Sequence, residues 1–436
     1  MRIRNKAIVY IWLPSQGFVS SGVLLVEEEG GQPLSMKFQY DKDYFEHPEA
    51  ISLDPVDLPL SNMGNIIDSP PEKRTFGVMF DCCPDNWGQK ILSLTASEKG
   101  VEIRYFDFIV SGGFHRIGAM GFGPDRNQGP RWDYYPLQED SDSQTVDIDL
   151  LARAFNQLES HGFHNVDRNI RKYLNTGSSV GGARPKALIV HKNKPHIAKF
   201  KSPDDIWDEP RVEYASMTLA AKAGLNVPSV SLLKTKKASI FLIERFDRED
   251  KDRKHVLSGM TMVGAKPGIM FINERHSYQD LCLVIDRFGH KNFIQKDKEE
   301  LYRRLICNIL LNNEDDHLRN FGFIWNKDGC RLSPLYDFTP SPSPARHLML
   351  NLGKNKTEMS LSNALSQCEY FGLEREKALG IAESIVQVFN RWESNFADCQ
   401  VTAKDLSTLR MVLDRNIRID LEFDKDAKMI LQAGWN

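Results

Sequence analysis

An aspartate, an asparagine and a second aspartate follow one another in an order that fits the transfer of a phosphoryl group. Asp315 is followed five residues later by Asn320, and Asp337 comes further along the chain. Phosphoryl transfer from a nucleotide needs one carboxylate to orient the attacking hydroxyl, and an Asn and an Asp whose oxygens hold magnesium against the phosphates. The Asp315-to-Asn320 interval equals that of a protein-kinase catalytic loop. Taken alone, this pair also fits a polar loop with an N-cap or an Asx-turn.

A glycine-rich segment, Gly177–Lys186, precedes these residues in the sequence. Gly181 and Gly182 would let backbone N–H groups approach phosphate oxygens, as a glycine-rich turn before a strand can do. The segment lacks the Gly-Lys-Ser/Thr of a Walker loop. Clusters of Gly and Ser are more often plain loops, so this segment indicates a phosphate site only together with other signals.

A lysine and a glutamate that could complete a kinase site follow the glycine-rich segment. Lys199 lies in an expected strand, where a kinase lysine contacts phosphates and pairs with a helix glutamate. Glu213 opens the next expected helix and is the candidate partner. An edge-strand lysine that extends into water is the alternative. Glu244 and Phe246 follow an apolar strand, at the position where a hinge presents backbone groups to adenine.

His317 has two acidic neighbours, Asp315 and Asp316, which raises the question of a metal cluster. One histidine beside adjacent acids is a weaker metal signal than the spaced His pairs of hydrolases, so we favour a structural role for it. No Gly-x-Ser-x-Gly elbow occurs in the sequence. The whole series is a glycine-rich loop, a strand Lys, a helix Glu, a hinge, Asp-x4-Asn and a later Asp. This is the order of a protein-kinase-like fold.

The elements that must position these residues can be read from the apolar pattern. The first 130 residues or so are β-rich with one short helical segment, and the polar stretch Gln138–Gln144 is the expected domain boundary. The apolar run Ala7–Leu13 follows basic residues, but it is short and lacks a cleavage site, so it predicts a first β-strand and not a signal peptide.

A small αβ lobe and a helical lobe are expected after this boundary, with a nucleotide cleft between lobes. Gly224 is the expected end of a helix, as a glycine C-cap. The predicted strands are 187–191, 196–200, 227–234 and 239–243, and the predicted helices are one from Asp147, then 212–223, 278–288, 298–311, 374–398 and 402–415. The predicted fold class is therefore α+β: a protein-kinase-like two-lobe fold with a β-rich N-terminal module and a mainly helical C-terminal lobe.

Length and composition bound the possible functions. The chain has 436 residues, which suggests two or three domains, and its 41% hydrophobic and 26% charged content is that of an ordinary globular protein. The net charge of −3 and the absence of a long basic run argue against direct binding of the chain to DNA. Seven scattered cysteines without a Cys-x-x-Cys pair predict reduced thiols and a cytoplasmic location. No stretch approaches the roughly 20 apolar residues of a membrane span.

These motifs together resemble the HipA family, the serine/threonine kinase toxins of bacterial toxin–antitoxin systems. The matching segments are Ser178–Ala187, Ile197–Phe200, Glu244–Arg248, Asn313–Asn320 and Leu332–Asp337, in the family's order, and Pro84–Gly88 resembles the end of its N-terminal module. The resemblance covers nearly the whole chain. It implies a β-rich N-terminal HipA module at 1–135, an ATP-binding lobe at 147–248 and a helical catalytic lobe at 255–436.

The resemblance also implies a role for each site residue, with ATP and Mg²⁺ as cofactors. Asp315 would be the catalytic base, and Asn320 and Asp337 would bind magnesium. The residues implied in ATP binding are Lys199, Glu213, Glu244, Phe246, Ser179, Val180, Gly181 and Gly182. Ser179 matches the serine that family members autophosphorylate, and the added charge would repel ATP phosphates; the adjacent Ser178 remains an alternative. The family often has lysine where this chain has Arg319, which exchanges a compact donor for a planar fork.

The family resemblance implies partners as well. Members phosphorylate a serine of an aminoacyl-tRNA synthetase, and they commonly pair with a small helix-turn-helix antitoxin that binds operator DNA, so DNA would be reached only indirectly. Two alternatives stay open: a catalytically inactive co-repressor or scaffold acting with the antitoxin, and a small-molecule kinase of similar fold. Retention of Lys199, Asp315, Asn320 and Asp337 argues against the inactive scaffold.

Overall fold

The computed structural model of the chain describes residues 2–14, 16–61, 64–130, 184–234, 239–266 and 276–414. Two predicted features lie outside these described residues. They are the helix expected from Asp147 and the part of the glycine-rich segment that contains Ser179, Val180, Gly181 and Gly182. The chain divides into two compact units. Unit 1 comprises Met1–Pro203, Thr235–Met270 and Gly322–Asp328, and unit 2 comprises Asp204–Lys234, Phe271–Phe321 and Gly329–Asn436. The predicted three-part division of the chain stays a prediction beside these two units.

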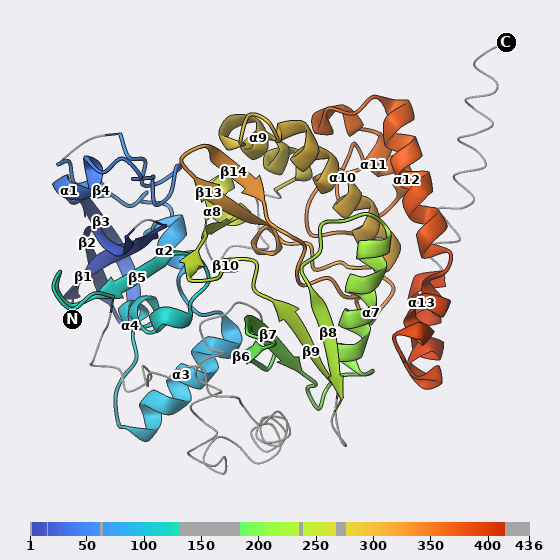
Figure 1. Cartoon of the computed structure of the whole chain (residues 1–436), viewed down its shortest axis with the longest axis horizontal. Coiled ribbons are helices and arrows are strands. Elements are labelled where there is room, and N and C mark those ends of the chain that lie inside the picture. Colours follow the sequence, from blue (N-terminus) through green and yellow to red (C-terminus); the bar gives the residue numbers. More distant parts are fainter. Residues whose placement is uncertain are drawn as a thin grey trace. The chain divides into compact units, whose positions relative to one another are not determined.

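Unit 1 begins with an antiparallel five-stranded sheet in the order β4-β3-β2-β1-β5, drawn in blue to teal in Figure 1. The apolar run predicted as a first strand is buried from Ala7 to Ile11, and the turn between the next two strands uses Gly30 and Gly31 at positive φ. The expected first strand is therefore confirmed. The strands are β1 (Arg2–Leu13), β2 (Gly17–Glu29), β3 (Gln32–Tyr40), β4 (Ile67–Asp68) and β5 (Met120–Gly123).

Short helices and short strands complete unit 1. The predicted helical segment after Pro84 is confirmed as α3. Asp81 accepts hydrogen bonds from the hydroxyl groups of Ser258 and Thr261, which ties the end of α2 to α8. The elements are α1 (Lys42–Phe45), α2 (Gly77–Asp81), α3 (Asn86–Glu98), α4 (Tyr105–Val110), η1 (Gly113–His115), β10 (Arg248–Glu249), β11 (Asp252–Arg253), β12 (His255–Ser258), α8 (Gly259–Val263) and β13 (Gly322–Asn326).

A second antiparallel sheet in unit 1 carries the predicted ATP-binding lysine. It contains β6 (Lys186–His191), β7 (Lys194–Phe200) and β9 (Ser239–Glu244), with β7 between β6 and β9. Lys199 on β7 pairs with Lys186 on β6 and with Phe241 on β9. The expected strands 187–191, 196–200 and 239–243 are confirmed, whereas the strand expected at 227–234 begins only at Val230. Lys199 is not on an edge strand, which removes the edge-strand alternative for this residue.

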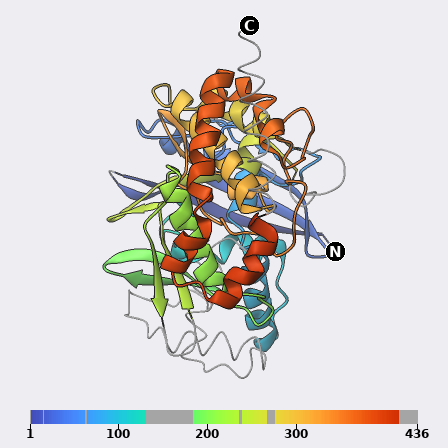
Figure 2. The ribbon, with the colours of Figure 1, turned by 90° about the vertical axis from the view of Figure 1, so that its right-hand side faces the viewer.

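Unit 2 is mainly helical, as expected, and Figures 1 and 2 show α7 beside α12 and α13. The elements are α7 (Glu209–Lys222), β8 (Val230–Lys234), α9 (Tyr278–Phe288), α10 (Ile294–Leu311), η3 (Leu318–Asn320), β14 (Gly329–Leu332), α11 (Leu361–Leu365), η4 (Cys368–Phe371), α12 (Arg375–Phe389), α13 (Trp392–Asp398) and a last helix at 403–414. Among the residues that the structure describes, none forms a helix long and apolar enough to cross a membrane.

One predicted helix is two helices in the structure. The apolar pattern predicts a single helix over 374–398, but α12 ends at Phe389 and α13 begins at Trp392. Arg391 leaves the helical conformation, with φ −108° and ψ 19°, and its carbonyl accepts a hydrogen bond from the Asn395 side chain at 2.7 Å. The backbone N–H of Asn395 donates to the same carbonyl at 3.1 Å, so α13 starts from Arg391, whereas the N–H of Arg391 bonds only three residues back, to the Val388 carbonyl (3.1 Å). The predicted α+β class and the helical C-terminal part are otherwise confirmed.

Candidate functional site

The predicted catalytic segment begins where α10 ends, at Asn312. This residue adopts the left-handed conformation, with φ 57°, and is fully buried. Its side-chain N–H groups donate to the carbonyls of Ser341 (3.2 Å) and Ser343 (2.8 Å), and its Oδ1 accepts the backbone N–H of Ala345 (2.8 Å). Asn tolerates this conformation better than most residues. The end of α10 is thereby fixed to the segment 341–345, and the chain leaves it in one defined direction.

Asp315, the predicted catalytic base, lies in the loop that follows. Its side chain is 68% exposed, so a substrate hydroxyl can reach it, and His317 Nε2 lies 3.7 Å from its Oδ1. Desolvation by the protein is the largest cause that raises the pKa of Asp315. The nearby His317 lowers this pKa, while the negative charges of Asp337 and Glu314 raise it further. The carboxylate of Asp337 thus acts electrostatically on Asp315.

Asn320, a predicted magnesium ligand, is oriented by this same loop. Its Nδ2 donates to the backbone carbonyl of Asp315 at 2.7 Å. Its carbonyl oxygen Oδ1 is therefore the end of the carboxamide that is left to bind a cation. The bond also joins the two ends of the Asp-x4-Asn motif directly, which explains why the interval between them matters.

Asp337, the second predicted ligand, is held near this loop by its neighbour. Tyr336 Oη donates to the backbone carbonyl of Arg319 at 2.8 Å, which joins the two segments. Asp337 itself has φ 53°, a sparsely populated conformation for a residue other than glycine. One Asp and one Asn match Mg²⁺, which is bound through one or two protein oxygens plus phosphates and water. Among the described residues, no group of three or more His, Cys, Asp or Glu has the arrangement of a metal site.

Asp316 anchors the loop from its buried side, a role that the sequence did not reveal. It is 1% exposed, and it accepts hydrogen bonds from Tyr278 Oη (2.9 Å) and from the backbone N–H of Met349 (2.6 Å). Burial raises the pKa of Asp316 to about 7, against these bonds, which lower it. The alternation of an exposed Asp315 and a buried Asp316 therefore anchors the loop while it leaves the Asp315 carboxylate accessible.

The other residues predicted to contact ATP belong partly to unit 1 and partly to unit 2. Lys199 on β7 and Glu244 and Phe246 at the end of β9 belong to unit 1, where Lys199 Nζ lies 5.9 Å from the Phe241 ring centroid. Glu244 Oε1 forms an ion pair with Lys194 Nζ at 2.6 Å. Glu213 belongs to unit 2 and is buried on α7. It was expected to open that helix, but α7 begins at Glu209, so Glu213 lies in the second turn.

The segment that follows Glu244 contains a buried ion cluster that the sequence did not predict. Asp247, 1% exposed, accepts hydrogen bonds from Arg245 (2.8 and 3.0 Å), from Arg248 (2.6 Å) and from the backbone N–H of Gly118 (2.8 Å). Arg245 and Arg248 also donate to the backbone carbonyl of Arg116. Within unit 1, this cluster joins the end of β9 to the segment 116–118. The motif thus has a structural role beside its predicted adenine contacts.

The chain resembles known proteins in both sequence and structure. A family model described as a HipA-like C-terminal domain matches residues 178–392. A Haemophilus influenzae protein named "Putative kinase" is 33% identical over 190 residues, which are 38% of this chain and 54% of that protein. The Shewanella oneidensis "Serine/threonine-protein kinase toxin HipA" is 21% identical over 185 residues, 36% of this chain and 42% of that protein.

A solved structure of similar fold covers more of the chain than these sequence matches do. The chain from the Shewanella oneidensis complex of HipA, HipB and operator DNA superposes with a TM-score of 0.68 at 18% identity, over 96% of this chain and 99% of that one. The predicted two-lobe fold is therefore confirmed. By sequence, the chain spans only about half the length, 40% to 54%, of the curated relatives it matches. Residues 178–392 therefore match the HipA-like C-terminal domain family, and the chain shares the fold of the chain from the Shewanella complex.

Proposed function

We propose that this chain is an ATP- and Mg²⁺-dependent serine/threonine protein kinase of the toxin–antitoxin type. The observation that carries the proposal is the loop of unit 2 that presents an exposed Asp315 and bonds it to Asn320, with Asp337 close by. A base and two oxygen ligands near one another are the set that phosphoryl transfer requires. The kinase names of the relatives support the same activity.

Each residue has a distinct task in this proposal. Asp315 orients the substrate hydroxyl and accepts its proton, and the Oδ1 of Asn320 and the Asp337 carboxylate hold magnesium. Lys199 contacts the ATP phosphates, and the backbone at Glu244 and Phe246 binds adenine. Bound Mg-ATP supplies the transferable phosphoryl group and the cation that neutralises its charge. Glu213 is the proposed partner of Lys199, as the helix glutamate of a kinase is.

The glycine-rich segment provides the proposed autophosphorylation site. Ser179 is the acceptor, and Val180, Gly181 and Gly182 bring backbone N–H groups to the phosphates. A phosphate on Ser179 would add nearly two negative charges beside the ATP phosphates and would reduce nucleotide binding. The external substrate is a protein, for which an aminoacyl-tRNA synthetase is the candidate. The proposed partner is a small helix-turn-helix antitoxin, a proposal supported by the HipB present in the solved Shewanella complex.

Mass spectrometry of the purified chain after incubation with Mg-ATP tests the activity. We expect one added phosphate on a peptide that contains Ser179, and none in Asp315→Gln, because this change removes the base but no core atom. Glu314→Gln is the matched control, since it removes the neighbouring carboxylate and should keep most of the transfer.

The variants separate the kinase from its alternatives. Equal phosphate yields in the wild type and in Asp315→Gln would show that Asp315 is not the base. An unchanged yield in Ser179→Ala would move the acceptor to Ser178 or elsewhere. If the wild-type chain neither gains phosphate nor binds Mg-ATP in a calorimetric titration, the inactive scaffold replaces the kinase as the better description.

A further inference from the structure

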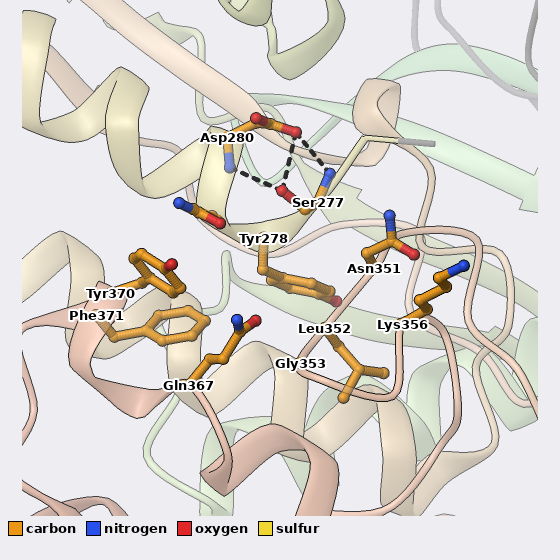
Figure 3. Close-up of a pocket in the computed structure, with 11 residues that line it drawn as sticks. Ser277, Tyr278, Asp280, Asn351, Leu352, Gly353, Lys356, Gln367, Tyr370 and Phe371 are labelled. Atoms are coloured by element: carbon orange, nitrogen blue, oxygen red, sulfur yellow. Dashed lines mark hydrogen bonds between the residues drawn. The ribbon is translucent and has the colours of Figure 1, made fainter. Parts of the chain in front are cut away.

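A pocket of about 320 Å³ lies within unit 2, and the proposed kinase site does not use it. Three stretches of chain form it: the start of α9, the turn after Asn351, and η4 with the residue before it. A space of this size would hold roughly ten water molecules at liquid density, which is the scale of an amino-acid-sized ligand. Figure 3 shows the lining residues, which are Ser277, Tyr278, Gln279, Asp280, Asn351, Leu352, Gly353, Lys356, Gln367, Tyr370 and Phe371.

The lining combines aromatic rings and carboxamides with one charge of each sign. Tyr278, Tyr370 and Phe371 supply the rings, which suit a planar group. Asp280 and Lys356 are its only charged side chains, and Figure 3 shows them on different sides of the pocket. The lining therefore has no net charge. It lacks the cluster of cations that a phosphorylated ligand needs, but it offers a partner to each end of a zwitterion.

The pocket is held open by its own framework. Ser277 caps α9, and Asp280 Oδ2 accepts hydrogen bonds from the Ser277 N–H (2.8 Å) and hydroxyl (2.9 Å). On the opposite wall, a side chain at Gly353 would place its Cβ 2.0 Å from the Asn363 carbonyl, so the turn after Asn351 requires glycine. Ligand pockets are usually preformed in this way, with a few placed polar groups.

The floor of the pocket is bonded to the catalytic segment. Tyr278 is 1% exposed, and its hydroxyl donates to Asp316 Oδ2 at 2.9 Å and accepts from Asn308 Nδ2 at 3.0 Å. Asp316 is the buried neighbour of Asp315, and the Tyr278 ring also contacts Phe321 with 5.6 Å between centroids. A ligand that orders Tyr278 therefore orders the anchor of the loop that carries Asp315.

We propose that this pocket binds a small zwitterion, a free α-amino acid with a planar side chain, which acts as an effector of the catalytic segment Asn313–Asn320. Lys356 binds the carboxylate, Asp280 binds the ammonium group, and the planar side chain packs against the half-buried Tyr370. The binding is independent of the proposed kinase function. Only the consequence for catalysis rests on that function.

Titration calorimetry on the full chain without nucleotide tests the binding. The probes are L-phenylalanine, L-tyrosine and L-histidine, with phenethylamine and 3-phenylpropionate as analogues that each lack one charge. We expect at least one amino acid to bind, and the analogues to bind about tenfold or more weakly. Lys356→Gln and Tyr370→Ala should weaken binding by a similar factor. Lys354→Gln, a neighbouring lysine outside the lining, should not change it.

Two results would overturn the site: no amino acid binds up to its solubility limit, or Lys356→Gln and Tyr370→Ala bind as the wild type does. Hydrogen exchange of the backbone tests the effector role without any kinase assay. Ligand should slow exchange in Asn313–Asn320 in the wild type, and the effect should be lost in Tyr278→Phe, which keeps the ring but removes the bond to Asp316. If the ligand binds but leaves exchange in this segment unchanged, the effector role is refuted, whatever the outcome of the phosphate measurement.

Discussion

At the scale of single residues, hydroxyl groups outside the kinase motif position the proposed magnesium ligands. The bond from Tyr336 to the Arg319 carbonyl joins the segments that carry Asn320 and Asp337. A single hydrogen bond of this kind contributes about 1 kcal/mol. Loss of this bond would let the two proposed magnesium ligands move apart, although they must lie close together to bind one cation. The loss should therefore lower the affinity for the metal more than the free energy of unfolding.

We expect Tyr336→Phe to weaken the binding of Mn²⁺ in the presence of ATP by about fivefold, with little change in the melting temperature. Electron paramagnetic resonance of free Mn²⁺ measures this directly. Tyr302→Phe is the matched control, because the buried Tyr302 hydroxyl has no hydrogen-bond partner among the described residues. An equal loss of affinity in both variants would show that the Tyr336 bond does not position the ligands.

A second prediction at this scale concerns the buried carboxylate of Asp247. Burial alone would raise its pKa, but the guanidinium groups of Arg245 and Arg248 and the bond from Gly118 outweigh burial and lower the pKa to about 2. A pKa below the value of 3.8 in the unfolded chain means that the ionised form favours folding. This contribution, about 2 kcal/mol, is complete above pH 4 and is lost as the pH falls towards 2.

We expect Asp247→Asn to lower the free energy of unfolding by about 3–5 kcal/mol near neutral pH, because it leaves two arginines buried without their partner. It should also remove the loss of stability that Asp247 contributes between pH 4 and 2. Urea denaturation across this range measures both effects. Asp250→Asn is the control, since Asp250 is exposed and asparagine accepts its positive φ. Equal stability of the two variants would mean that the cluster is not stabilising.

The site residues differ in how far the sequence reveals them. Asp315 and Asn320 were found because a short motif with fixed spacing carries their chemistry, and the structure shows the bond that fixes it. Asp316 was missed because its partner Tyr278 is 38 residues away. The backbone carbonyls that accept from Arg245 lie about 130 residues away, at 115 and 116. Such pairings depend on the folded chain and leave no local pattern.

At the scale of elements, the end of α10 determines where the catalytic segment begins. Asn312 combines a left-handed backbone with three side-chain bonds to the segment 341–345. Two substitutions separate these contributions. Glycine keeps the backbone conformation and loses the bonds, whereas alanine loses both.

We expect Asn312→Gly to cost about 2 kcal/mol of unfolding free energy, and Asn312→Ala about 1 kcal/mol more. Phosphate transfer should fall in the same order, because Asp315 follows the cap by three residues. Chemical denaturation and the autophosphorylation rate provide the measurements. If Asn312→Ala has the same stability and the same autophosphorylation rate as Asn312→Gly, the left-handed end of α10 does not contribute to the position of the loop.

Elements with a strong apolar period were predicted well, and others were not. The ends of the helix predicted at 278–288 agree with the structure, because its apolar positions repeat regularly. The split between α12 and α13 was missed, because the apolar period continues on both sides of Arg391, where the backbone leaves the helical conformation. The short helix α2, of five residues, gives too brief a pattern to detect.

At the scale of the whole molecule, charge limits what the chain binds by itself. Its 56 basic and 59 acidic residues leave a net charge of −3. Non-specific affinity for DNA comes mainly from the release of counterions by clustered Lys and Arg, and it falls steeply with salt. A chain with this balance lacks that driving force, so the proposed DNA contact must come through a basic partner.

We therefore expect the purified chain to show no binding to a fluorescent DNA duplex at physiological salt, where non-specific DNA binders have dissociation constants of about 10⁻⁴–10⁻⁶ M. Addition of the proposed helix-turn-helix antitoxin should create binding, with a salt dependence set by the antitoxin. Fluorescence anisotropy measures both. Micromolar binding by the chain alone that weakens steeply with salt would reveal a basic surface on the chain itself. The antitoxin would then not be required for contact with DNA. The near-zero net charge of the chain would in that case not predict its affinity for DNA, because a local cluster of basic residues would determine it.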